Sequence, residues 1–210
     1  MGYVEPLCPD GAGAQNRMTI APRPYHHGDL RNTLLGAARS ILEEEGLAAL
    51  SLRAVARRAG VSHAAPYRHF PNHEALLAEL AIEGFFDLKE ALGKACAHGG
   101  PTDDRIANIG AAYMRFVAQR PALVRLMFGP QLPNRESFPD LGCAADAIAE
   151  EIGAALHDPA LGLAVWAAVH GLAVLILENV IDLGQRRSGL HVLPSRAEIL
   201  LRSLFTAAQQ

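Results

Sequence analysis

Apolar positions recur every three or four residues along most of this chain, which is the spacing of one face of an α-helix. In the first such segment Leu30, Leu34 and Ile41 share a face. Asp29 is placed to cap the start of this helix and Gly46 to end it. The same pattern predicts further helices at 52–59, 62–70, 73–96, 102–119, 122–127, 140–156, 159–183 and 195–208. No useful strand alternation and no internal repeat interrupts them, so the sequence predicts an all-α fold.

The helices change character near residue 100. Those before it are mostly short and are separated by Gly60 and Pro71, whereas those after it are longer and more apolar. We therefore predict a flexible N-terminal arm at 1–28, a three-helix unit at 29–73 and a larger helical unit at 74–210. Ser51 and Asn72 are each placed to cap the helix that follows them. Asp158 before a proline predicts another helix start, and so does a capping box from Ser195 to Glu198.

The run 160–177 carries no formal charge and is long enough to cross a membrane. His170 lies in its middle, and Glu178 and Asp182 follow it directly, which disfavours a span. We favour a helix that is buried inside its own unit and against a partner. The alternative for the whole chain is a membrane-associated or small-molecule-binding helical protein that does not act on DNA.

Composition places the chain among folded proteins, because half of its 210 residues are apolar and 20% are charged. The net charge of −3 argues against a generally basic nucleic-acid coat. The charge is nevertheless segregated, since residues 51–70 contain four arginines and no acidic residue. These arginines are Arg53, Arg57, Arg58 and Arg68. We expect Arg57 and Arg58 to lie on the solvent-exposed surface.

The three cysteines, Cys8, Cys96 and Cys143, are scattered and form no CxxC motif. They argue against a disulfide framework or a zinc site and favour a reducing, cytoplasmic compartment. The sequence contains no phosphate-binding glycine loop, HExxH motif or nucleophile elbow. We therefore expect no catalytic residues, no metal, no cofactor and no enzymatic activity.

Segment 51–70 has the pattern of a helix-turn-helix. Ala56 is small enough for two helices to approach, and Gly60 can adopt the positive φ of a tight turn. Ser62 is placed to cap the second helix, which then presents only the small side chains of Ala64 and Ala65 at its entry. Such an entry fits deeply into a major groove, where thymine methyl groups lie.

These residues resemble the DNA-binding region of TetR-type transcriptional regulators. The resemblance covers about thirty positions and rests on Ser51, Val55, Ala56, Ala59, Gly60, Val61, Ser62, Tyr67, His69, Phe70, Glu74, Leu76 and Leu77. A second stretch, Trp166 to Gly171, is similar to the Trp-His-Gly signature of one C-terminal domain type in that family. The resemblance implies a three-helix DNA-binding domain followed by a larger ligand-binding and dimerisation domain.

The resemblance also implies the residues that contact DNA, namely Ser51, Arg53, Ser62, His63, Ala64, Ala65, Tyr67, Arg68 and His69. Tyr67 and His69 are expected on phosphates, and the others on bases or backbone. Packing of the Tyr67 ring on the first helix is the alternative for that residue. The chain departs from the family at Pro66, where an aliphatic residue is usual. The missing N–H predicts a distorted recognition helix that starts late, near Ala64.

In the larger unit we expect a pocket for a small, mainly apolar effector. Its candidate residues are Tyr113, Met114, Phe116, Val117, Met127, Phe128, Trp166, His170 and Glu178, and ordinary core packing is the alternative for each. His170 is either a satisfied core histidine or a polar group of the pocket. The last two helices are expected to form a homodimer face. The resulting hypothesis is a repressor that such an effector releases from a palindromic double-stranded DNA operator.

Overall fold

The computed structural model describes residues 27–97 and 99–207. Every regular element in these stretches is a helix, which confirms the predicted fold class. The predicted arm lies outside them up to residue 26, and its last two residues belong to the first helix. The α-helices are α1 (His27–Glu44), α2 (Leu52–Arg58), α3 (His73–Cys96), α4 (Thr102–Gln119), α5 (Pro121–Phe128), α6 (Pro139–Leu156), α7 (Pro159–Leu177), α8 (Gln185–Ser188) and α9 (Leu193–Ala207). Short 3₁₀ turns lie at η1 (Leu47–Ala49), η2 (Pro66–Arg68), η3 (Arg135–Ser137) and η4 (Leu190–Val192).

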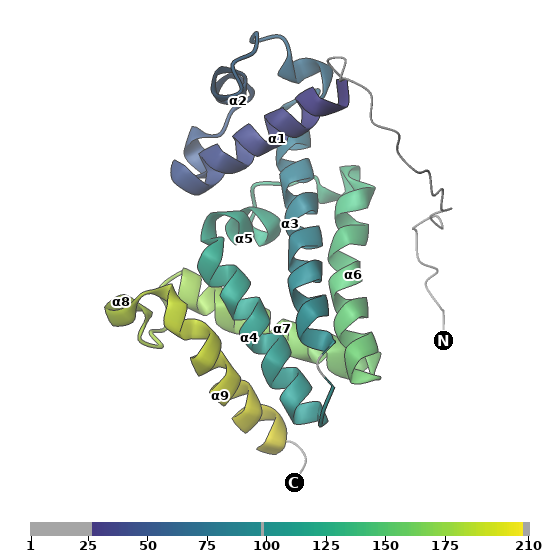
Figure 1. The fold of residues 1–210 in the computed structure, drawn as a ribbon, viewed down its shortest axis with the longest axis vertical. Coiled ribbons are helices and arrows are strands. Elements are labelled where there is room, and N and C mark those ends of the chain that lie inside the picture. The colour runs from purple at the N-terminus through teal and green to yellow at the C-terminus, as the bar shows by residue number, and fades with distance from the viewer. Residues whose placement is uncertain (1–26, 98, 208–210) are drawn as a thin grey trace, which may run out of the picture.

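The helices form a small head and a larger body (Figure 1). The head consists of α1, α2 and η2, and the body contains α4 to α9. The long helix α3 begins in the head and runs down into the body, where it packs against α4, α5 and α6. Leu34 of the head, Phe85 of α3 and Leu193 of the body belong to one continuous apolar core. The boundary at residue 73 therefore stays a prediction, because α3 serves both units.

Three predicted caps are confirmed. The Ser51 hydroxyl accepts from the Ala54 N–H at 3.1 Å, and the Asn72 side chain accepts from the N–H of Ala75 at 2.8 Å. The Asp158 carboxylate accepts from two N–H groups of the first turn of α7. Each cap satisfies donors that the helix itself leaves unpaired, so these boundaries follow from local chemistry.

Two helices begin earlier than predicted. Helix α1 begins at His27, so Asp29 lies within its first turn and does not precede it. Helix α9 begins at Leu193, so Ser195 lies inside the helix and does not cap it. A proline at the second position of α9 is compatible with this start, because its missing N–H would be unpaired there.

Helix α7 ends at Leu177, six residues before the predicted end. Asn179 adopts a left-handed conformation with φ 56, and the N–H of Val180 bonds to the carbonyl of Leu175 at 2.8 Å. This arrangement is a C-terminal cap of the Schellman type, in which asparagine replaces the usual glycine. Helix α7 is long and apolar enough to cross a membrane, and 33% of it is buried within this chain. It is therefore less enclosed by its own unit than predicted.

The cysteines differ from one another. Cys96 at the end of α3 is a free thiol, and burial raises its pKa to about 11. Cys143 lies in α6, remote from Cys96 in the chain.

Candidate nucleic-acid interface and effector cavity

The helix-turn-helix of the head is built on a buried α2 and a tight turn. Val55 and Ala56 are fully buried, so α2 packs closely against its neighbours. Gly60 has φ 69, as expected for the residue that turns the chain. The Val61 N–H then bonds to the carbonyl of Ala56 at 3.0 Å and closes the turn. These contacts fix the direction in which the following segment leaves α2.

The recognition segment, residues 62–70, is not a regular helix. Its only helical element is the 3₁₀ turn η2, which begins at Pro66. The N–H of Ala65 bonds to the carbonyl of Ser62 at 3.0 Å, because the next residue has no N–H to offer. The late start is therefore confirmed, although it falls at Pro66 instead of near Ala64. The predicted side-chain cap at Ser62 is wrong, since Ala65 precedes η2 and no side chain caps it.

A buried aromatic ring anchors the end of the recognition segment. Phe70 is 1% exposed, and its N–H bonds to the carbonyl of Pro66 at 2.8 Å. The Arg31 guanidinium of α1 lies over its ring, 5.6 Å from the centroid. The short turn is thus held at both ends, which positions the residues between them.

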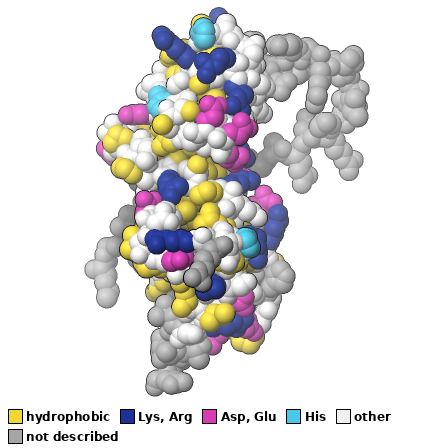
Figure 2. Space-filling model, turned by 90° about the vertical axis from the view of Figure 1, so that its left-hand side faces the viewer, with side chains coloured by type: hydrophobic (Ala, Val, Ile, Leu, Met, Phe, Trp, Pro, Cys, Tyr) yellow, Lys and Arg dark blue, Asp and Glu magenta, His cyan; other side chains and the backbone are white. Residues whose placement is uncertain are grey.

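The residues predicted to contact DNA lie mostly on the surface of the head. Tyr67 is 52% exposed, which disfavours the alternative that its ring is buried against the first helix. Two of the nine predicted residues, Ala65 and His69, are half-buried. The other seven are exposed, namely Ser51, Arg53, Ser62, His63, Ala64, Tyr67 and Arg68. Figure 2 shows Lys or Arg side chains and a histidine gathered at this end of the molecule.

The arginines of the head divide into two groups. Arg58 is held by Glu44 at 2.8 Å and Glu45 at 2.5 Å, so it ties α2 to the end of α1. Arg53 and Arg68 are exposed and form no ion pair within the residues that the structure describes, and the same holds for Arg57. The second group is therefore free to bind an external anion.

The body contains a cavity of about 320 Å³ between α5, the loop after it and α7. We call it the effector cavity. Its lining includes three residues of the predicted pocket, Phe128, His170 and Glu178. Sequence analysis missed the remainder, which is Val124, Arg125, Gly129, Pro130, Gln131, Val174 and Leu177. The glycine and proline that end α5 were the available signal, because they turn the chain back over α7.

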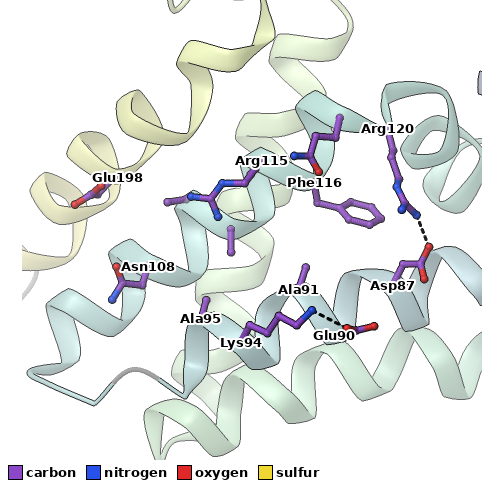
Figure 3. Close-up of a pocket in the computed structure, with 13 residues that line it drawn as sticks. Asp87, Glu90, Ala91, Lys94, Ala95, Asn108, Arg115, Phe116, Arg120 and Glu198 are labelled. Atoms are coloured by element: carbon purple, nitrogen blue, oxygen red, sulfur yellow. Dashed lines mark hydrogen bonds and ion pairs between the residues drawn. The ribbon is translucent and has the colours of Figure 1, made fainter.

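The other predicted pocket residues lie elsewhere. Tyr113, Met114, Val117 and Met127 are buried in the core, and Trp166 is half-buried against it. Phe116 lines a separate groove of about 570 Å³ between α3, α4 and α9. Figure 3 shows this groove with Arg115 and Asn108 from α4 and Glu198 from α9 on its walls.

His170 joins the core to the effector cavity. Its Nδ1 lies 2.8 Å from the Tyr113 hydroxyl, and its ring centroid lies 4.1 Å from that of Phe128. Burial lowers the pKa of His170 and raises the pKa of Tyr113, so both groups favour their neutral forms. The two alternatives for this histidine are thus combined, because it has a core partner and also lines the cavity.

Ion pairs connect the head to the body. Arg39 of α1 contacts Glu83 at 2.6 Å and Asp87 at 3.3 Å, both on α3. Asp87 also pairs with Arg120, which joins α4 to α5 and lines the groove of Figure 3. Sequence analysis missed this set, since its members are far apart in the chain and each alone has the pattern of a solvated surface charge.

Comparison with known proteins agrees with this architecture. Residues 34–80 match the family described as bacterial regulatory proteins of the tetR family, and residues 106–188 match a tetracyclin repressor-like C-terminal domain. The chain belongs to the TetR family. The matches confirm the helix-turn-helix unit and the family, whereas the Trp-His-Gly subtype stays a prediction.

Relatives within the TetR family include an HTH-type transcriptional regulator of Mycobacterium bovis. It is 32% identical over 126 residues, which cover 54% of this chain and 53% of that protein. The chain thus spans about half the length of this curated relative. A Rhodococcus protein of unknown function is 31% identical, with a TM-score of 0.63 and coverage of 87% and 98%. FadR from Bacillus subtilis, solved with stearoyl-CoA, shares the fold at 16% identity, with a TM-score of 0.62 and coverage of 82% and 97%.

Proposed function

We propose that this TetR-family protein is a ligand-responsive transcriptional repressor that binds a palindromic DNA operator as a homodimer. The observation that carries the proposal is the exposed face of the head. Tyr67, Arg53 and Arg68 are all exposed there, and the two arginines form no ion pair within the described chain. Free arginines and a phenol are the groups that hold phosphate oxygens and position a reading element on a duplex. No catalytic role is expected for this family member.

The exposed apolar side chains of the body support the homodimer. Leu163 and Leu175 of α7 are 55% and 42% exposed, and Ile199 of α9 is 65% exposed. Figure 2 shows apolar side chains on the surface below the charged head. A second copy would remove such surface from water, which is the main favourable contribution to association. Two heads related by a two-fold axis would reach major grooves about 34–36 Å apart, so a palindromic operator follows.

The effector cavity supports control by a small, mainly apolar ligand in the cytoplasm. FadR from Bacillus subtilis, which shares the fold, was solved in complex with stearoyl-CoA, so a protein with this fold can bind a ligand. Helix α3 runs from the cavity-bearing body to the head, so a change in helix packing would move the recognition segment. The effector would act through its different affinities for the DNA-bound and the free states.

The proposal is tested by selecting genomic fragments that the purified dimer retains and measuring their affinity by fluorescence anisotropy. We expect Tyr67→Ala to lose at least tenfold in affinity for the selected operator, since it removes a charge-assisted hydrogen bond to phosphate from each half-site. Tyr67→Phe is the matched control for the ring and should lose nearly as much. Circular dichroism and size-exclusion chromatography verify that both variants stay folded and dimeric. Unchanged operator affinity in a folded Tyr67→Ala dimer would contradict the proposal.

Association with a membrane is the second candidate, and the limited burial of α7 is the observation that favours it. A vesicle flotation assay separates the two functions. Recovery of the protein as a dimer in detergent-free buffer, without flotation, supports the regulator. Flotation through α7 would support the alternative.

A further inference from the structure

The effector cavity carries no unpaired formal charge among its lining residues. Arg125 and Glu178 line it and pair with each other, with 3.1 Å between Nε and Oε1. A second nitrogen of Arg125 donates to the carbonyl of Leu177 at 2.6 Å. The two charges of this half-exposed pair already neutralise each other, so the lining offers a charged ligand no unpaired counter-charge. The cavity is therefore matched to an uncharged ligand.

The tautomer of His170 follows from its partners deeper in the core. The indole Nε1 of Trp166 is buried and closes no hydrogen bond in the described residues. Tyr113 is buried as well, and its hydroxyl lies within hydrogen-bond distance of Nδ1 of His170. A buried hydroxyl proton needs an acceptor, and Nδ1 is the acceptor that the hydrogen bonds of the described residues offer it.

The Tyr113 proton is then free to be donated to Nδ1 of His170, 2.8 Å away. This direction gives the Tyr113 proton an acceptor, whereas the reverse direction leaves that buried proton without one in the described residues. A neutral imidazole that accepts at Nδ1 carries its hydrogen on Nε2. His170 lines the cavity, so this N–H is the donor that it has left for a ligand.

The rest of the lining is apolar apart from one amide. Val124, Phe128 and Val174 supply the apolar surface. The Oε1 atom of Gln131 is buried and has no hydrogen-bond partner in the described residues. This oxygen lies 2.1 Å from the position that a Cβ on Gly129 would occupy. The absence of a side chain at Gly129 therefore allows the Gln131 amide to fold back over the end of α5. This oxygen is an acceptor, so a carbonyl group cannot pair with it, and His170 remains the donor on which a carbonyl oxygen can bind.

We propose that the effector cavity selects an uncharged, mainly apolar molecule that carries a carbonyl acceptor, such as a ketone or an ester, and binds that oxygen through the Nε2–H of His170. This inference deepens the proposed function, because it names the chemical class of the effector. The cavity volume of about 320 Å³ lies at the small end of ligand pockets.

The test compares four probes of similar length: the nine-carbon compounds 2-nonanone, nonanoate and nonylamine, and 2-methyl-1-nonene, in which a CH₂ group replaces the ketone oxygen. Trp166 is the only tryptophan of the chain and its ring lies 6.4 Å from Phe128, so quenching of its fluorescence reports binding to the full-length dimer. We expect 2-nonanone to bind about tenfold more tightly than the alkene, which leaves the buried donor unpaired. We expect the two charged probes to bind more weakly still.

Variants of the donor decide whether His170 is responsible. His170→Phe keeps an aromatic ring against Phe128 but removes the N–H, so the ratio of ketone to alkene affinity should fall to about one. His170→Gln keeps a donor and should retain part of the ratio. Tyr113→Phe releases Nδ1 and should lower the ratio even if His170→Phe fails to fold. Arg115→Ala, in the separate groove of Figure 3, is the matched control and should change nothing.

Three results would overturn the proposal: no binding of the ketone, tighter binding of nonanoate or nonylamine, or an unchanged ratio in both His170→Phe and Tyr113→Phe. The assay contains no DNA, so its outcome is independent of the repressor function. A Tyr67→Ala dimer that has lost operator affinity should still prefer the ketone. A protein that binds the ketone as expected but never binds an operator would refute the proposed function and leave the ligand class standing.

Discussion

Two arginines on the exposed face of the head and three arginines between helices of the body differ in their pairing. On the head, Arg53 and Arg68 are exposed and have no ion-pair partner in the described part of the chain. In the body, Arg120 and Arg202 pair with carboxylates on other helices, and Arg125 pairs with Glu178 directly after α7. A guanidinium left free can release counterions from DNA, whereas a paired one joins helices and leaves a neutral cavity. The position of the arginines, more than the net charge of −3, therefore separates the two functions.

The two regions also differ in how closely their backbones pack. The recognition segment contains a single turn of three helical residues, at η2. In the body, α6 and α7 cross so closely that a Cβ on Gly162 would lie 2.5 Å from the backbone of Gly153. The recognition segment therefore has a short turn where a regular helix was predicted, whereas the body depends on closely packed helix crossings. The largest effects on stability should accordingly come from the body.

The strongest prediction on that difference concerns Gly162→Ala. The added methyl group meets backbone atoms of Gly153, which cannot move away as a flexible side chain would. We expect a loss of about 3 kcal/mol in the free energy of unfolding, measured by urea denaturation at fixed protein concentration. Gly171→Ala is the control on the same helix, because nothing lies within 4 Å of its Cβ position. Equal stability of the two variants would show that the α6–α7 crossing is not tight.

The next prediction concerns the free arginines of the head. Arg68→Ala should remove one phosphate contact from each half-site and weaken operator binding about tenfold. The slope of log affinity against log salt should fall by about 2 for the dimer, because each lost contact contributes about 1. Arg58→Ala is the control, since that side chain is occupied by Glu44 and Glu45. Similar losses of salt slope in both variants would remove the distinction between free and paired arginines.

A smaller effect is expected where the two regions meet, at Asp87→Asn. This change weakens both the pair with Arg39 of the head and the pair with Arg120 of the body. All three side chains are about one third exposed, so the loss in unfolding free energy should be about 1 kcal/mol. Glu90→Gln is the control, because its pair with Lys94 lies within α3 alone.

Effector control of the same variants completes that test. The ion pairs of Asp87 would transmit the effect of a bound ketone from the body to the head. In that case the change in operator affinity caused by the ketone should shrink in Asp87→Asn and stay unchanged in Glu90→Gln. A full response in Asp87→Asn would assign the coupling to helix packing instead.

Local signals determined how much of this molecule could be predicted. Ser51, Asn72 and Asp158 cap their helices as expected, because a cap depends on residues within one turn. The end of α7 was missed because its apolar pattern continues through Ile181, although Asn179 already carried the signal for a left-handed cap.

Contacts between distant segments were not predictable in the same way. The pairing of Asp87 with Arg39 and Arg120 depends on how three helices pack, and no spacing in the sequence reports it. The effector cavity was found only in part for the same reason. Sequence analysis identified Phe128, His170 and Glu178, which are aromatic or polar. Val124 and Gln131 line the cavity only because the chain turns back after α5.

The smallest effect on stability should come from Pro66→Leu, which tests why the head lacks a regular recognition helix. A leucine supplies an N–H and relieves the crowding of the preceding turn, but it gives up the restriction that proline places on the unfolded chain. These effects oppose each other, so we expect the unfolding free energy to change by less than about 1 kcal/mol. Operator affinity should change more, since a helix that starts nearer Ser62 moves His63 and Tyr67 relative to the groove. Hydrogen exchange should show new protection at residues 65–68 if the helix lengthens. The same exchange rates and the same operator affinity as in the original protein would show that Pro66 does not determine the shape of the recognition segment.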